Sequence, residues 1–135
     1  MHFGKPLWAV MFAAAMAAGC STSGGDCCGG GTTRGGVRHV VLFKFKDDAR
    51  PEQIREVESE FRALKNRIPG VLSLEWGTNV SPEGLNQGFT HCFFVSFPDT
   101  KARDAYLPHE AHQNFVKILR PVLDKVLVID YVAKD

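Results

Sequence analysis

The spacing of apolar residues changes its period several times between Val37 and Val132, and the order of these changes limits the fold more than any other feature. In residues 37–46 one alternating face is apolar apart from His39, as in a strand that is buried on one side. In residues 54–68 apolar residues recur every three or four positions with charges between them, as in an amphipathic helix. The folded part of the chain therefore begins with a strand followed by a helix.

The ends of this first helix are marked by residues that favour helix boundaries. Pro51 suits a first helical turn, and Glu52 adds negative charge near the positive end of the helix dipole. The pair Pro69-Gly70 stops a helix. The sequence therefore predicts a helix between residues 51 and 68.

The middle of the chain reads as two strands joined by a loop. Residues 71–79 contain alternating apolar positions, and residues 80–88 (VSPEGLNQG) have the composition of a loop. Residues 89–97 alternate so that His91 and Phe93 share one face. Thr90, Cys92, Phe94 and Ser96 share the other face of this third strand.

The last third of the chain predicts a broken helix and a final strand. A short helix over residues 101–107 precedes Pro108, a second helical segment covers residues 109–119, and residues 125–132 form a strand rich in Val and Ile. The order is β-α-β-β-α-β. We therefore expect an α+β protein of the ferredoxin-like type, in which a four-stranded antiparallel sheet carries helices on one face.

The second face of this sheet is also rich in apolar residues and would be exposed in a monomer. Exposed apolar surface of this size is typical of an interface. A homodimer that stacks two sheets face to face covers it most simply. If Phe93 belongs to that face, its replacement by Asp gives monomer or insoluble protein.

The N-terminal residues 1–20 read as an export signal. A weakly basic start is followed by an apolar run from Leu7 to Ala18, which is too short to cross a membrane as a helix. The end, Ala17-Ala18-Gly19-Cys20, resembles the bacterial lipobox, with Ala17 where Leu is usual. The sequence therefore predicts a lipoprotein with lipidated Cys20; an ordinary secretory signal and an unprocessed anchor are the alternatives.

Residues 21–36 are rich in Gly and Ser and predict a flexible linker between the lipid and a domain over residues 37–135. By resemblance to enterobacterial sorting rules, Ser21 favours the outer membrane, facing the periplasm. Cys27 and Cys28 in the linker are interpreted as incidental thiols, an inter-subunit disulfide, a labile redox pair or a weak metal site.

The charge balance excludes one broad class of partner. The chain has 16 Lys and Arg against 15 Asp and Glu, and a nucleic-acid-binding protein needs a basic stripe to displace counterions from phosphates. The Gly-rich stretch lies in the linker and not between a strand and a helix, so it is no phosphate loop. We expect no nucleic acid and no cofactor.

Several short segments follow one another in a fixed order across residues 37–134. They are residues 37–46 (VRHVVLFKFK), Ile68-Pro69-Gly70-Val71, Gly77, Asn79, Gly88-Phe89-Thr90-His91, residues 106–112 (YLPHEAH) and Asp130-Tyr131. In these segments the sequence resembles the stress-responsive α/β-barrel (Dabb) family, with Glu110 where the family usually has Pro. The resemblance implies a dimeric α+β barrel, and the family includes plant stress proteins, uncharacterised bacterial proteins and a polyketide cyclase.

The resemblance also implies a catalytic pair. In the cyclase relatives a Tyr and a His at the positions of Tyr106 and His112 act on the substrate. Carried over, His112 is a general base, which suits an imidazole titrating near neutral pH, and Tyr106 orients or polarises a carbonyl.

The other histidines of the domain are candidate ligand-binding residues. His39 and His91 lie among apolar residues on strand faces, and His109 marks a helix start, where the helix dipole favours the neutral ring. A purely structural role is the alternative for each of them. A metal held by His109, His112 and His91 is a further alternative, but a helical pair supplies too few ligands for a catalytic zinc, so we expect no metal.

Three functions remain open on the sequence alone. The first is an envelope-anchored homodimer of the Dabb fold that binds a small apolar ligand or serves a stress-related role at the cell envelope. The second is a cofactor-independent cyclase, isomerase or lyase that uses His112 and Tyr106, and the third is a non-catalytic structural module. A sizeable cavity at Tyr106 and His112 favours the enzyme, whereas a fully packed interior favours the structural module.

Overall fold

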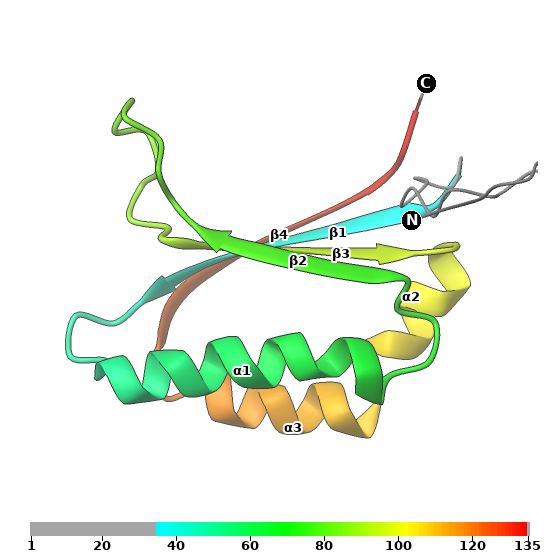
Figure 1. The fold of residues 1–135 in the computed structure, drawn as a ribbon, viewed down its shortest axis with the longest axis horizontal. Coiled ribbons are helices and arrows are strands. Elements are labelled where there is room, and N and C mark those ends of the chain that lie inside the picture. The colour runs from blue at the N-terminus through cyan, green and yellow to red at the C-terminus, as the bar shows by residue number, and fades with distance from the viewer. Residues whose placement is uncertain (1–34, 135) are drawn as a thin grey trace, which may run out of the picture. The chain divides into compact units, whose positions relative to one another are not determined.

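The computed structural model describes residues 35–134, so the predicted leader over residues 1–20, most of the predicted linker and Cys20, Cys27 and Cys28 lie outside this range. The described residues form the predicted β-α-β-β-α-β order, and each boundary lies within two residues of its expected place. The elements, shown in Figure 1, are β1 (Val37–Phe45), α1 (Pro51–Arg67), β2 (Ser73–Thr78), β3 (His91–Phe97), α2 (Thr100–Tyr106), α3 (Glu110–Leu119) and β4 (Leu123–Val132).

The four strands form one antiparallel sheet in the order β2-β3-β1-β4. Helices α1 and α3 lie side by side against one face of this sheet, and the opposite face carries no helix (Figure 1). The expected ferredoxin-like fold is therefore confirmed. Among the described residues, none of the helices combines the length and hydrophobicity that a membrane crossing requires.

An aromatic core fills the space between the sheet and the two long helices. Phe61 of α1 stacks on Phe93 of β3 with ring centroids 4.1 Å apart, and Phe43 of β1 lies 5.3 Å from Phe93. Phe115 of α3 completes the group at 4.8 Å from Phe61. Burial of such side chains contributes roughly 1.5–3 kcal/mol each, so this cluster holds both helices on the sheet.

Phe93 belongs to this core, and the expectation that it lies on the dimer face is wrong. Its side chain is fully buried beneath the helices, whereas the neighbouring Phe94 is half-buried on the open face. Both faces of β3 carry large apolar residues, so the alternation alone did not show which face the helices cover. Substitution of Phe93 by Asp would destroy the core rather than test an interface.

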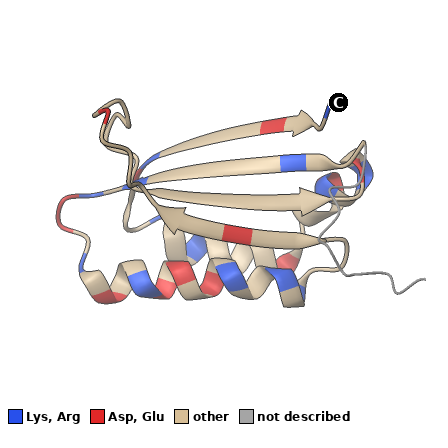
Figure 2. Ribbon diagram, turned by 45° about the horizontal axis from the view of Figure 1, so that its top comes forward, with Lys and Arg blue, Asp and Glu red and all other residues tan. Residues whose placement is uncertain are grey.

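The open face of the sheet is apolar along β4. Leu127, Ile129 and Tyr131 are 41%, 51% and 46% exposed. The strands carry few charged residues over most of their length, whereas α1 is densely charged (Figure 2). This is the pattern of a surface that is covered by a partner.

Strand β4 is an edge strand that extends beyond the helices. Val126 and Val128 pair with Phe43 and Val41 of β1 and share their helix-side face, yet they are 49% and 48% exposed. The helices therefore leave part of the inner face of the sheet uncovered next to β4, and a cleft opens there.

Candidate functional site

The cleft lies between α3 and the inner face of β1 and β4, and it has a volume of about 380 Å³. This volume falls in the range of small-molecule sites. Its walls are mostly aliphatic and aromatic, and polar side chains come from His39, His112, Arg120 and Asp130. The apolar lining residues are Val41, Phe43, Phe61, Leu107, Phe115, Val116, Leu119, Leu123, Val126 and Val128.

His112 lines the cleft from the first turn of α3. Its Nδ1–H donates a hydrogen bond of 2.9 Å to the carbonyl oxygen of Leu107, which also accepts from the side-chain amide of Gln113 at 2.7 Å. A carbonyl can only accept, so Nε2 carries the lone pair of the neutral ring. Burial lowers the pKa of His112, and the nearby His39 adds to this effect. The ring is therefore a neutral base at pH 7.

His39 is a second imidazole in the same cleft, and its orientation is fixed by a carboxylate. Its Nδ1 lies 2.6 Å from Asp130 Oδ1, and its side chain is only 6% exposed. The carboxylate accepts the Nδ1 hydrogen, and Nε2 has no hydrogen-bond partner among the described residues. His39 and Asp130 meet because they are directly opposite in the β1–β4 register.

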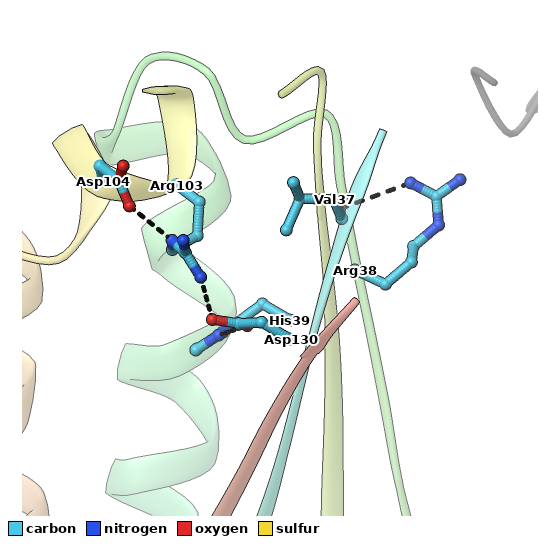
Figure 3. A network of polar contacts seen from close by, with 6 residues as sticks. All are labelled: Val37, Arg38, His39, Arg103, Asp104 and Asp130. Carbon is cyan, nitrogen blue, oxygen red and sulfur yellow. Dashed lines mark hydrogen bonds and ion pairs between the residues drawn. The ribbon is translucent and has the colours of Figure 1, made fainter. Parts of the chain in front are cut away.

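Asp130 is itself held by a charged network, drawn in Figure 3. Arg103 of α2 pairs with Asp130 Oδ2, and its Nε donates a 2.8 Å hydrogen bond to Asp104. Both oxygens of Asp130 are therefore engaged, one by His39 and one by Arg103. This arrangement ties the end of β4 to α2 and fixes the ring of His39.

Tyr106, the last residue of α2, packs against both imidazoles. Its ring centroid lies 4.6 Å from that of His112 and 5.9 Å from that of His39. Tyr106 does not line the cleft itself; it is 1% exposed, and its hydroxyl has no hydrogen-bond partner among the described residues. Burial raises the pKa of this hydroxyl well above its usual range, so it stays protonated and able to donate.

His91 lies away from this cluster, and both of its ring nitrogens have partners. Its Nε2 is 3.1 Å from Glu58 Oε1, and its Nδ1 is 2.8 Å from Thr90 Oγ1. Trp76 stacks on the ring at a centroid distance of 6.4 Å. His91 also borders a larger hollow of about 640 Å³ under the loop between β2 and β3, which includes Cys92 of the open face.

His109 is the N-cap of α3. Its Nδ1 accepts a 3.1 Å hydrogen bond from the backbone amide of Ala111, which requires an unprotonated Nδ1. His109, His112 and His91 thus lie in three different environments. The described part of the chain contains no group of three or more His, Cys, Asp or Glu side chains arranged to hold a metal ion.

Sequence reasoning missed Asp130 and Arg103 as members of the site. Asp130 is the only charged residue in the run from Val126 to Val132, and a carboxylate in such a strand needs a partner. That signal marks Asp130, but it does not identify His39, which is 91 positions away in the sequence.

Comparison with known proteins places the domain among proteins of diverse function. Residues 37–133 match the family model of the stress responsive A/B barrel domain, Dabb. The chain is 44% identical over 98 residues to the stress-response A/B barrel domain-containing protein HS1 of Arabidopsis thaliana, covering 73% of this chain and 90% of that protein. It is 31% identical to olivetolic acid cyclase of Cannabis sativa, covering 73% and 97%.

Solved structures agree with the fold and with a dimer. The hydroxynitrile lyase of Passiflora edulis superposes with a TM-score of 0.71 at 25% identity, covering 76% of this chain and 96% of that one. A dimeric protein of ferredoxin-like fold from Bacteroides fragilis gives a TM-score of 0.61 at 27% identity, covering 73% and 97%. Dimeric neighbours support self-association of this chain. The family match over nearly the whole folded domain, together with the identity to HS1, shows that the chain belongs to the stress-responsive A/B barrel (Dabb) family.

Proposed function

We propose that this protein binds a small, largely apolar molecule in the cleft between α3 and β4 and catalyses a proton transfer on it. One observation carries the proposal. Two imidazoles, His39 and His112, line an apolar cleft next to the buried hydroxyl of Tyr106. Each imidazole has a partner at Nδ1, and within residues 35–134 neither Nε2 nor the Tyr106 hydroxyl has one. Of the three functions open on the sequence, a cavity at Tyr106 and His112 favours the enzyme of cyclase, isomerase or lyase type; His112 lines the cleft, whereas Tyr106 packs against the His112 ring without lining it.

The roles follow from the hydrogen bonds of each side chain. His112 is neutral at pH 7 because burial lowers its pKa, so its Nε2 can take a proton from a carbon or hydroxyl next to a carbonyl. The mostly apolar walls lower the local polarity around His112, which strengthens electrostatic interactions there relative to water. Tyr106 retains its hydrogen but is buried outside the cleft lining, so its donation to a ligand oxygen requires a rearrangement of the side chains around it.

The relatives point in the same direction. One is named as a cyclase and one as a lyase, and reactions of both kinds require acid–base groups. Activities differ between proteins of one fold, so family membership alone does not establish the activity of this chain. The argument for this chain rests on its own imidazoles.

The test is hydrogen–deuterium exchange into a panel of aryl alkyl ketones in D₂O, catalysed by the full-length chain. A positioned general base contributes roughly 10²–10⁴-fold, so His112→Ala should lower the exchange rate at least about 100-fold. The matched control is His91→Asn, which removes an imidazole whose nitrogens are both occupied and should leave the rate per folded molecule unchanged. Equal rates in both variants contradict the role of His112.

A carrier without catalysis is the competing function. Native mass spectrometry of the purified protein separates the two. A co-purified small molecule that is lost in His112→Ala, without exchange activity in the wild type, supports a ligand-binding protein instead of an enzyme.

We further propose that the active form is a homodimer that uses the open face of the sheet, where Leu127 and Ile129 are exposed. Substitution of Phe94, which is half-buried on this face, by Asp should yield a soluble monomer, measured by sedimentation. A dimer that survives this change contradicts the interface.

We also propose that the protein is an envelope lipoprotein, lipidated at Cys20 and facing the periplasm from the outer membrane. The support is the apolar run that ends at Cys20 and the Gly-rich linker after it. Metabolic labelling with a palmitate analogue should mark the wild type but not Cys20→Ala, and fractionation of the envelope tests the membrane.

A further inference from the structure

The cleft contains a single cationic side chain among the described residues, Arg120. Arg120 follows α3 as its C-cap, and in the described part of the chain its guanidinium takes no ion-pair partner. Arg67 and Arg103, in contrast, form ion pairs with Glu60 and Asp130. Within residues 35–134, no neighbouring carboxylate therefore forms an ion pair with the charge at this edge of the cleft.

The polar groups of the cleft fall into two sets. His112 lies in the first turn of α3 and Arg120 follows its last residue, so the two are separated by about 12 Å along the helix at a rise of 1.5 Å per residue. His39 and Asp130 belong to the His112 end, since the ring of Tyr106 contacts both imidazoles. Apolar side chains such as Phe115, Val116 and Leu119 line the wall of the cleft between these two sets of polar groups.

The charged side chains at the Arg120 end and at the His112 end of the cleft favour one orientation of a negatively charged ligand. A long arginine side chain covers an apolar wall with its methylene groups and keeps its guanidinium in water at the rim. The guanidinium matches a carboxylate in shape and charge. At the other end Arg103 is already paired with Asp130, so among the described residues it is not free to bind the carboxylate of a ligand.

We infer that the ligand of this cleft is a small carboxylic acid, with its carboxylate on Arg120 at the rim and its apolar body along α3. This inference rests on the proposed function and narrows it, because the reacting oxygen function then lies at the far end of the ligand, next to His112. The alternative is a purely structural role, in which Arg120 complements the negative end of the α3 dipole. In that case ligand binding does not depend on a carboxylate.

The experiment compares octanoate with its uncharged analogue octanamide by calorimetric titration of the full-length chain. A charge-assisted hydrogen bond at the rim should make octanoate bind about ten-fold more tightly than octanamide. Arg120→Gln should remove this preference and leave octanamide binding unchanged. The matched control is Lys117→Gln, which removes a cation of α3 that does not line the cleft, and which should keep the preference.

A cleft-filling variant separates failure of this inference from failure of the proposed function. Val128 lines the cleft on the half-exposed edge strand, so Val128→Trp should block both probes while its thermal unfolding shows that it folds. Equal binding of both probes, still blocked by Val128→Trp, overturns the role of Arg120 and leaves the cleft as the binding site. Absence of binding, or binding that ignores Val128→Trp, overturns the inference and the cleft together.

Discussion

Two histidine clusters on the inner face of the same sheet differ in how completely their polar atoms are paired. At one end, both nitrogens of His91 have partners in Glu58 and Thr90. At the other end, His39 and His112 each keep one nitrogen free, and the hydroxyl of Tyr106 has no partner among the described residues. Buried polar groups are normally paired, so the incomplete end is the one to expect at a binding site.

The paired cluster around His91 is expected to contribute to stability, and the incompletely paired cluster around His112 to function. A buried polar group left without a partner costs roughly 1–3 kcal/mol. The His91 cluster avoids this cost because both ring nitrogens are paired. In the His112 cluster the buried hydroxyl of Tyr106 has no partner among the described residues, so the cost applies there. Sites that depart from the rules of a well-paired interior are often functional, and each of the two ends can be perturbed separately.

Among the variants that compare the two clusters, the largest effect is expected from Asp130→Asn. Arg103 would bind the amide oxygen and turn the amide NH₂ toward His39, which would then accept at Nδ1 and carry its hydrogen on Nε2. We expect at least a ten-fold loss of ketone exchange, because Nε2 of His39 would then carry a hydrogen and could no longer accept one from a group in the cleft. Nitrogen-15 NMR of the histidines reads the tautomer directly, and an unchanged His39 spectrum contradicts the argument.

A substitution in the paired cluster around His91 should change the stability of the protein and not its activity. Glu58→Ala removes the acceptor of His91 Nε2 and leaves that group buried without a partner. The free energy of unfolding should fall by about 1–3 kcal/mol, measured by urea denaturation. The exchange rate per folded molecule should stay at the wild-type value, and a loss of activity would place His91 in the reaction.

Tyr106→Phe should change stability and function in opposite directions. It deletes a buried hydroxyl that has no partner among the described residues, so the free energy of unfolding should rise by about 1 kcal/mol. Exchange activity should fall if the hydroxyl serves the ligand. Destabilisation on removal of the hydroxyl would show that it has a partner, and unchanged activity would remove Tyr106 from the mechanism.

The smallest effect concerns pH. Burial lowers the pKa of folded His112 below the unfolded value of 6.5, so below pH 6.5 the unfolded chain binds more protons at this site than the folded one. The stability should therefore fall as the pH drops through 6.5 toward the folded pKa. The contribution of His112 is obtained as the difference from His112→Asn, in which this part of the slope should be absent.

The local patterns predicted the elements well, because each pattern reflects a periodicity that a helix or strand must satisfy. Pro51 lies in the first turn of α1, as expected, and Gly70 has a φ of +91° with the Cβ of Ala102 only 3.3 Å from where a side chain would begin. The position of Phe93 was not predictable in the same way, since both faces of β3 are apolar and only the docking of α1 and α3 distinguishes them.

By itself, the sequence determined the order of strands and helices, the residues that share each face and the family resemblance that singled out His112 and Tyr106. The tertiary structure alone decided that His39 meets Asp130 and that His91 meets Glu58. These pairs depend on strand register and helix docking between segments far apart in the chain, and no local period encodes which distant residues come to lie opposite each other. For the same reason, the cleft and Arg120 at its edge emerge only once α3 lies against the sheet and β4 extends beyond it.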